Sequence, residues 1–337
     1  MPVKTSGKKG RKKPARKSGA KRPRPLCVAL TGPCGYIGEL VLERLLRSDR
    51  VEKVVCLDSV RPVIESEKLL YYTVDLTNPT ADVLIADILQ REEVDVFVHC
   101  AFFSGPHRNT GYGHELMVIG TINVLNACAA KGIKSLEVLS TTLVYGAKRD
   151  NPNYLAEDHP MRGGRGYPYV RDRVEVENLL ADFERRHPEI RVAVLRPCTV
   201  MGSDTRDFFA MYLKQGIVPT VFGYDPLFQF VHESDVAEAF HQAVFSKVRG
   251  QFNVVGEGVL PLSSAIKLLG NANLPVSMTA ARMGANLLWS ARVLKFSARH
   301  VDYLLFHLIA DGARMQKVLG FRPRFNSREA LSGIKGY

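Results

Sequence analysis

The chain has 337 residues, 46% of them hydrophobic and 24% charged, which is ordinary globular composition with ample material for a core. Its formal charge of +12 is unevenly spread, because residues 1–25 hold eleven Lys or Arg and no Asp or Glu. Removing those eleven from the 46 bases leaves 35 against 34 acids, which excludes a body that is basic throughout.

We expect residues 1–25 to form a disordered basic tail, since Pro, Gly, Ser and Lys dominate there. The tail lacks the apolar stretch of a secretory signal. It is either a solvated tail with no partner or a weak, salt-sensitive contact for nucleic acid or an anionic surface. No run of about 18 uncharged apolar residues predicts a transmembrane helix. Six cysteines without a CxxC pair indicate buried, reduced thiols in a cytoplasmic protein, with no metal site.

From residue 26 onward, short apolar runs alternate with longer amphipathic ones. This pattern predicts an α/β fold, a Rossmann-type doubly wound parallel sheet, over residues 26–202. Helices are expected at 36–47, between the third and fourth strands, at 113–131 and at 174–187. Strands are expected at 26–32, 53–58, 69–75, 95–101, within 136–146 and at 191–197.

After about residue 200 the alternation stops. We expect residues 203–337 to form a smaller, mixed, largely helical C-terminal substrate lobe, interleaved with the first domain. Short strands are expected within 229–233 and 251–256, and 280–319 is expected to be mostly helical. Asp235 is the expected N-cap of the helix that follows it. The stretch 281–309 mixes apolar and basic residues, which fits core and lid packing or a groove for an apolar substrate.

The first predicted strand ends in TGPCGYIG, residues 31–38, with Gly32, Gly35 and Gly38 at a strand-to-helix junction. Glycines at this position let a pyrophosphate approach the helix N-terminus, where free N–H groups attract anions. Asp58 ends the second strand, where a carboxylate accepts hydrogen bonds from ribose hydroxyls and repels a 2′-phosphate. The pattern favours NAD over NADP. The alternative is a structural glycine turn with a solvent-exposed aspartate.

The stretch Asp75–Leu76 follows the third predicted strand. It either holds the adenine of the cofactor or provides an ordinary turn residue in Asp75.

Over about residues 26–325 the chain resembles the extended short-chain dehydrogenases/reductases, the NAD-dependent epimerase/dehydratase family that acts on nucleotide sugars. The resemblance rests on ordered motifs that include VHCA at 98–101, STTLVYG at 140–146, PYVRDRVEVE at 168–177, LRPCTVMG at 195–202 and FVHESDVAEA at 230–239. It implies NAD as the cofactor. The implied cofactor contacts are Gly32, Gly35, Tyr36, Ile37, Gly38, Asp58, Asp75, Leu76, Cys100, Ala101, Tyr169, Arg173 and Pro197.

The resemblance also implies a mechanism in which a tyrosine exchanges a proton with the substrate while hydride moves to or from the nicotinamide. It assigns the tyrosine to Tyr169, the neighbouring hydroxyl to Thr141 and the family's lysine position to Arg173. A helix would put Tyr169 and Arg173 on one face. Arginine keeps the positive charge that favours a phenolate but cannot pass a proton onward. A second departure is Met117, which stands where the family usually has asparagine.

These departures leave two classes of function open. One is an NAD-dependent oxidoreductase, epimerase or dehydratase acting on a nucleotide sugar or similar secondary alcohol, with a hydroxysteroid-type dehydrogenase as a variant. The other is a catalytically weak NAD-binding sensor or scaffold, for which Tyr169 and Arg173 would be a binding or packing pair. The resemblance implies a homodimer through the helices at 113–131 and 169–187. His107, Arg108 and His114 lie in a loop that either faces the substrate or is solvated.

Overall fold

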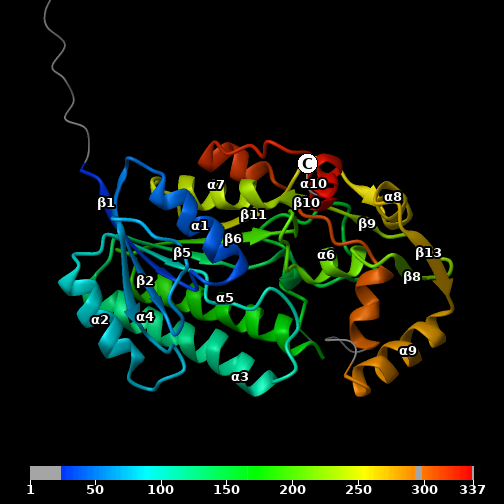
Figure 1. Ribbon diagram of the computed structural model, residues 1–337, viewed down its shortest axis with the longest axis horizontal. Coiled ribbons are helices and arrows are strands. Elements are labelled where there is room, and N and C mark those ends of the chain that lie inside the picture. The colour runs from blue at the N-terminus through cyan, green and yellow to red at the C-terminus, as the bar shows by residue number, and fades with distance from the viewer. Residues whose placement is uncertain (1–23, 165, 293–297, 336–337) are drawn as a thin grey trace, which may run out of the picture.

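The computed structural model describes residues 24–164, 166–292 and 298–335 of the chain (Figure 1). A central sheet of seven strands has the order β11-β6-β5-β4-β1-β2-β3, and each neighbouring pair is parallel. The predicted α/β class and parallel sheet are therefore confirmed. The strands are β1 (Leu26–Thr31), β2 (Val51–Asp58), β3 (Leu69–Thr73), β4 (Val96–His99), β5 (Ser135–Leu139), β6 (Arg191–Pro197) and β11 (Gly250–Val254).

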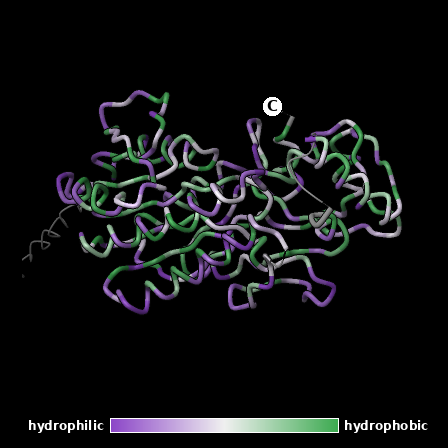
Figure 2. Tube along the Cα trace, turned by 90° about the horizontal axis from the view of Figure 1, so that it is seen from below, coloured by the Kyte–Doolittle hydropathy of each residue, from purple (hydrophilic) through white to green (hydrophobic). Residues whose placement is uncertain are grey.

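Helices cover both faces of this sheet, which is why its inner strands are almost continuously apolar. Helices α1 and α7 lie on one face, and α2, α4 and α5 lie on the other (Figure 1). In Figure 2 many of the outer loops carry the hydrophilic colour. The helix bounds are α1 (Tyr36–Leu46), α2 (Ala81–Arg91), α4 (Gly120–Lys131), α5 (Pro168–Arg186) and α7 (Glu233–Val244).

Helix boundaries follow local chemistry. Helix α4 ends at Gly132, whose φ of 67° is a left-handed conformation that glycine adopts without strain. Helix α5 has Pro168 at its first position, where no intrahelical N–H is needed. It therefore begins six residues before the predicted 174–187, and Tyr169 and Arg173 both lie inside it.

The predicted helix over 113–131 is divided into three segments. Helix α3 (Thr110–His114) runs into the π-helical turn η1 (Glu115–Ile119), which runs into α4. The wider turn contains Met117, one of the positions at which the sequence departs from the family that it resembles. Local π-helical turns are frequent at functional sites.

The C-terminal part of the chain contributes to both the sheet and a smaller lobe. Strand β11 pairs with β6 at the edge of the central sheet, and α7 packs against α1. The interleaving expected from the sequence is therefore present, although the boundary at residue 202 stays a prediction. The lobe contains α6 (Phe208–Leu213), β8 (Ile217–Val221), β9 (Leu227–Phe228), β12 (Leu260–Pro261), α8 (Leu262–Leu268), β13 (Ala272–Val276), α9 (Met278–Ser290) and η3 (Ala298–Leu304). The π-helical turn η4 (Met315–Leu319) instead packs against β11 of the central sheet.

Three short elements lie between the sheet and the lobe. Strand β7 (Thr199–Met201) pairs with β10 (Phe230–His232), and η2 (Thr142–Tyr145) is a 3₁₀ turn that follows β5. The last elements are α10 (Ser327–Ser332), which begins with a capping box between Asn326 and Glu329, and the 3₁₀ turn η5 (Gly333–Lys335).

The assignment of Asp235 as an N-cap is wrong. Helix α7 begins two residues earlier and is capped by His232, whose side chain accepts a hydrogen bond from the Ser234 N–H. The Asp235 carboxylate instead accepts from the backbone N–H groups of Arg324 and Phe325, at 3.0 and 3.2 Å. Asp235 therefore ties α7 to the C-terminal segment, a contact that no local pattern encodes.

Other expectations have mixed outcomes. All six cysteines are free thiols, and five of them are buried, with Cys34 half-buried. Within the part of the chain that the structure describes, no helix has both the length and the apolar character needed to cross a bilayer. The expectation of a disordered tail falls on residues 1–23, which lie outside the described residues, as do 293–297 of the stretch 281–309.

Candidate active site

The glycine loop after β1 is tightly folded. Gly32 has a φ of 70°, and its carbonyl oxygen accepts a hydrogen bond of 3.0 Å from the Gly35 N–H. A Cβ atom on Gly38 would overlap that same carbonyl oxygen, so only glycine lets the first turn of α1 pack there. The loop therefore presents a bare backbone at the carboxyl end of β1, as an anion-binding loop requires.

A cavity of about 230 Å³ lies at this end of the sheet. The carboxyl ends of neighbouring parallel strands meet at one edge, so residues that follow β1, β2, β3 and β4 converge on it. Phe102, Phe103 and Tyr112 add aromatic surface to the lining. Seven of the predicted cofactor residues line this cavity: Gly32, Gly35, Asp58, Asp75, Leu76, Cys100 and Ala101.

The two acidic residues of the cavity differ in their surroundings. The Asp58 carboxylate accepts hydrogen bonds from the Val60 N–H and the Ser59 hydroxyl, at 3.2 and 3.4 Å, while burial raises its pKa. The Asp75 carboxylate accepts from both the N–H and the hydroxyl of Thr77, at 2.9 and 2.7 Å. Asp75 is therefore a turn-forming residue that also lines the cavity, and its contact with an adenine stays a prediction.

The other predicted cofactor residues do not line this cavity. Ile37 and Gly38 are buried in the first turn of α1. The Tyr36 hydroxyl donates a hydrogen bond of 2.5 Å to Glu233 at the start of α7. Tyr36 therefore joins the glycine loop to α7, which packs against α1 on the same face of the sheet. Pro197 is the last residue of β6. Tyr169 and Arg173 lie on α5, and they belong to the second part of the site.

The three predicted catalytic side chains come from β5 and α5. Thr141 follows β5 and caps a short 3₁₀ turn, where its hydroxyl accepts a hydrogen bond from the Leu143 N–H. Tyr169 is in the first turn of α5, and Arg173 is one turn further along. The Arg173 guanidinium carbon lies 5.6 Å from the centroid of the Tyr169 ring and 4.2 Å from that of Phe102.

Arg173 is held on two sides. Its guanidinium donates to the Leu139 carbonyl at 2.8 Å and to the Phe103 carbonyl at 3.0 Å. Its Nε is buried and has no hydrogen-bond partner among the described residues. A lysine could not span both carbonyls, because its ammonium is a single point rather than a fork. The geometry is that of a fixed positive charge close to Tyr169.

Sequence reasoning missed a buried histidine beside this group. His99 bonds to the hydroxyls of Thr31 and Thr121, at 2.7 and 3.0 Å. Burial, assisted by the charge of Arg173, lowers the pKa of His99 to about 3. The Thr121 hydroxyl in turn donates to the Met117 carbonyl at 2.5 Å. His99 is therefore a neutral link between β1, β4 and α4, and its presence within VHCA was the only available signal.

A buried ion pair lies next to Thr141. Arg196 makes a two-pronged contact with Glu177, with the shortest distance at 2.5 Å, and both side chains are 3% exposed or less. The Ser140 hydroxyl donates to Glu177 at 2.5 Å, and Arg196 donates to the Tyr145 hydroxyl at 2.7 Å. Arg196 therefore braces β6 against α5, and its side chain does not line the cavity at the glycine loop.

The loop after β4 extends to the C-terminal lobe. His107 stacks on Phe103 with ring centroids 4.4 Å apart. The Arg108 guanidinium lies over the Trp289 ring of α9, 4.4 Å from its centroid, and donates to the Trp289 carbonyl at 2.7 Å. The loop therefore contacts the lobe through Arg108. That it faces the substrate stays a prediction.

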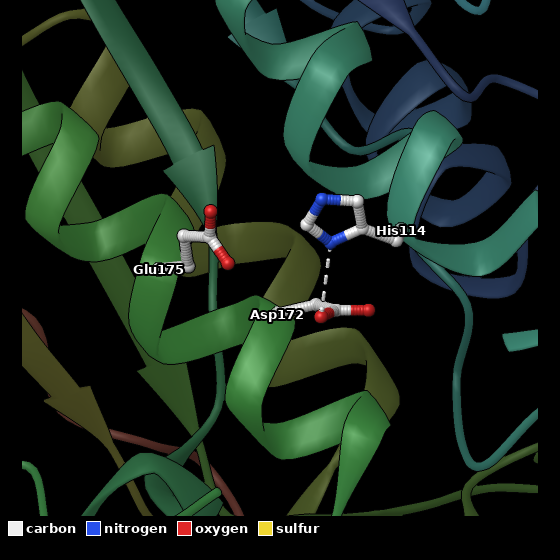
Figure 3. Close-up of side chains that lie close together, drawn as sticks. All are labelled: His114, Asp172 and Glu175. Atoms are coloured by element: carbon white, nitrogen blue, oxygen red, sulfur yellow. Dashed lines mark hydrogen bonds and ion pairs between the residues drawn. The ribbon is translucent and has the colours of Figure 1, made fainter. Parts of the chain in front are cut away.

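His114 has a different environment. Its Nδ1 lies 3.2 Å from the Asp172 carboxylate, and Glu175 lies on the same helix as Asp172 (Figure 3). Ligand atoms of the three lie within 4.8 Å of one another. Arg171 also donates two hydrogen bonds to Asp172, at 3.0 and 2.8 Å. The carboxylate that a cation would need is thus already paired, and the cluster joins α3 to α5 as an ionic contact.

A smaller cavity of about 30 Å³ lies between the sheet and the C-terminal lobe. Thr142 and Leu143, which follow Thr141, form part of its wall, as do Cys198 and Thr199 beyond β6. The rest of the wall is formed by Phe209, Leu227, Phe228, Gln229, Tyr303, Phe306 and Leu308.

Comparison with known proteins agrees with this geometry. Residues 28–255 match the NAD dependent epimerase/dehydratase family. An uncharacterized protein of Mycobacterium tuberculosis is 28% identical over 314 residues, which cover 91% of this chain and 82% of that protein. UDP-glucose 4-epimerase 2 of Oryza sativa is 28% identical over 190 residues, or 52% of this chain and 45% of that enzyme.

Among solved structures, MoeE5 in complex with UDP-glucuronic acid and NAD is 25% identical. It aligns with a TM-score of 0.70 over 91% of this chain and 96% of its own. The match to the family model covers more than half of the sequence, and the glycine loop, Asp58 and the α5 tyrosine all fall within it. The chain belongs to the NAD-dependent epimerase/dehydratase family.

Proposed function

We propose that the protein catalyses NAD-dependent oxidation or reduction at a secondary alcohol carbon of a nucleotide sugar, within an epimerase or dehydratase reaction. The observation that carries the proposal is the placement of Tyr169 and Arg173 on one face of α5, with the guanidinium 5.6 Å from the phenol ring. The names of the similar proteins, which include a UDP-glucose epimerase and a UDP-glucuronic acid complex, support the substrate class.

The cofactor is proposed to occupy the cavity of about 230 Å³. The glycine loop would take the pyrophosphate, Asp58 the adenosine ribose, and Leu76 and Asp75 the adenine edge. The donor set fits, because a bare backbone loop and a carboxylate at a strand end are the groups that bind a dinucleotide. When bound, NAD supplies the hydride acceptor and donor.

The role of the chain is to handle the proton. Oxidising an alcohol to a ketone removes a hydride from carbon and a proton from oxygen, and Tyr169 is proposed to take that proton on its phenol oxygen. Arg173 would stabilise the negative charge of the phenolate without taking part in proton transfer. Thr141, which precedes the wall residues Thr142 and Leu143 of the smaller cavity, would orient the substrate oxygen with its hydroxyl.

The second candidate is an NAD-binding protein with little catalysis. It is favoured by one observation: the two Arg173 nitrogens that could contact a cofactor ribose already donate to backbone carbonyls. In that case Tyr169 and Arg173 would pack the start of α5. A hydroxysteroid-type dehydrogenase remains a variant of the first candidate.

The proposal includes a homodimer formed through α3, η1, α4 and α5, where Ile119 at the end of η1 is 38% exposed. Sedimentation of the purified protein would test it. We also propose that the basic tail makes a weak, salt-sensitive contact with nucleic acid or an anionic surface.

The deciding experiment follows UDP-glucose in the presence of NAD by NMR, which detects epimerised, oxidised or dehydrated sugar. Tyr169→Phe should lower turnover roughly 10²–10⁴-fold while NAD binding, measured by calorimetry, stays nearly unchanged. Arg173→Lys should lower turnover as well, because lysine cannot hold both carbonyls. A wild-type protein that binds NAD but converts neither UDP-glucose nor a wider panel of nucleotide sugars would favour the second candidate.

A further inference from the structure

The walls of the smaller cavity are mostly aromatic and aliphatic. Its volume of about 30 Å³ accommodates one small group, a water molecule or a hydroxyl or hydroxymethyl substituent, but not a sugar ring. It lies beside the hydroxyl proposed to orient the substrate, since Thr142 and Leu143, which line it, follow Thr141. On the opposite wall, the Tyr303 ring packs against Tyr167 with centroids 5.6 Å apart, two residues before Tyr169.

Tyr303 differs from four of the other five buried tyrosines, Tyr169 being the fifth. Four of these donate hydrogen bonds: Tyr36 to Glu233, Tyr145 to Asn253, Tyr167 to Asp302 and Tyr212 to the Pro219 carbonyl. Tyr303 is 6% exposed, yet its hydroxyl has no hydrogen-bond partner among the described residues. Burying a hydroxyl without a partner is unfavourable, and native proteins rarely keep one.

The hydroxyl has the chemistry of a donor. Burial raises the pKa of Tyr303, and the neighbouring Tyr169 adds to that effect, so the hydroxyl keeps its proton at neutral pH. Gln229, another polar group in the wall, is not free to act in its place, because it bonds to the backbone of Ala310 through both its amide nitrogen and its oxygen. Because the Tyr303 side chain lines the cavity, a substituent that enters it can supply the acceptor.

We propose that Tyr303 is a substrate-binding residue, whose hydroxyl donates a hydrogen bond to one small oxygen-bearing substituent of the sugar, a hydroxyl or hydroxymethyl group, seated in this cavity. The inference rests on the proposed function. It adds a specificity determinant from the C-terminal lobe to a site whose other groups come from the Rossmann sheet. A substrate that lacks the matching oxygen would leave the hydroxyl unpaired and be disfavoured.

The test compares Tyr303→Phe with Tyr167→Phe, which alters the neighbouring ring whose hydroxyl is paired with Asp302 at 2.9 Å. Tyr303→Phe removes only an unpaired hydroxyl, so its Tm should equal or exceed that of the wild type. Its kcat/KM for UDP-glucose should fall roughly 10-fold through the lost hydrogen bond. Tyr167→Phe should lower the Tm.

Two results overturn the inference. One is an unchanged kcat/KM in Tyr303→Phe, as expected if a buried water alone pairs the hydroxyl. The other is a loss of Tm as large as that of Tyr167→Phe, which marks a structural tyrosine. If the wild type converts no nucleotide sugar, the proposed function fails separately. Calorimetry of UDP-glucose on the NAD-loaded protein then decides: weaker binding by Tyr303→Phe supports the inference, and equal or absent binding overturns it.

Discussion

The cavity beside the glycine loop and the smaller cavity next to Thr142 are built in different ways. The larger one, beside the glycine loop, is lined by residues that follow four strands of a single repeated strand–helix pattern, all between positions 32 and 116. The smaller one combines residues near positions 142 and 199 with others between 209 and 308. The first is specified by short motifs, and the second by packing between distant segments. Local sequence therefore encodes the cofactor side of the site more completely than the substrate side.

Among the substitutions that test this difference between the cofactor side and the substrate side, Gly38→Ala is expected to have the largest effect on stability and NAD affinity. The new Cβ meets a backbone oxygen that cannot move cheaply, so the variant should lose about 3 kcal/mol of unfolding free energy and most of its NAD affinity. Gly216→Ala, in the lobe, meets no atom within 4 Å and serves as the control. Denaturant unfolding and NAD calorimetry measure both effects. Equal effects of the two substitutions would contradict the contrast.

The central sheet also holds a buried carboxyl group, that of Glu137, which lines neither of these cavities. One of its oxygens has no hydrogen-bond partner among the described residues. Glu137 on β5 is 2% exposed, and burial raises its pKa from 4.5 to about 8. Between these values the unfolded chain has released the proton while the folded protein keeps it. Stability should therefore fall as the pH rises through this window, by about 1.4 kcal/mol per pH unit at most.

Glu137→Gln should flatten that pH dependence and be the more stable protein at pH 8. Unfolding free energies at pH 5.5, 6.5 and 7.5 would show it. If the wild-type slope persists in the variant, a different group is responsible for it.

A smaller effect is expected from Asp58→Ala. Losing a charged hydrogen bond to the ribose should weaken NAD binding by about 2 kcal/mol, or roughly 30-fold, and should narrow the preference for NAD over NADP. Asp75→Ala should cost less, because the Asp75 carboxylate is already engaged by Thr77. Calorimetry with both cofactors gives the ranking. If the wild type binds NADP more tightly than NAD, Asp58 does not contact the adenosine ribose.

The smallest effect is expected from deleting residues 1–23. These residues carry charge but almost no apolar side chains. The free energies of unfolding and of NAD binding should therefore stay within about 0.5 kcal/mol of those of the full chain. The deletion keeps Arg24, which pairs with Asp95 at 2.8 Å alongside Lys134. A large drop in either quantity would mean that the tail contacts the folded body.

Prediction from sequence succeeded where the relevant contacts are close along the chain. The glycine spacing, the position of Asp58 and the four-residue step from Tyr169 to Arg173 each depend on one element or one junction. These local relations also carried the family assignment.

Prediction failed where the partners are remote. The partners of His99 are residues 31 and 121, and those of Asp235 lie at 324 and 325. The isolated hydroxyl of Tyr303 is visible only once the lobe is packed against the sheet. None of these relations leaves a periodic trace, because tertiary packing decides them.

The position of β11 affects how the protein is made. Residues 198–249 separate this strand from its partner β6. At ribosomal rates of 5–20 residues per second, about 50 residues take roughly 3–10 seconds to synthesise. During that interval β6 is an open sheet edge with unpaired backbone groups, which invite pairing with other chains. A nascent or truncated chain that stops before residue 250 is thus expected to aggregate, and the nucleotide-binding half cannot be produced alone by cutting at residue 202.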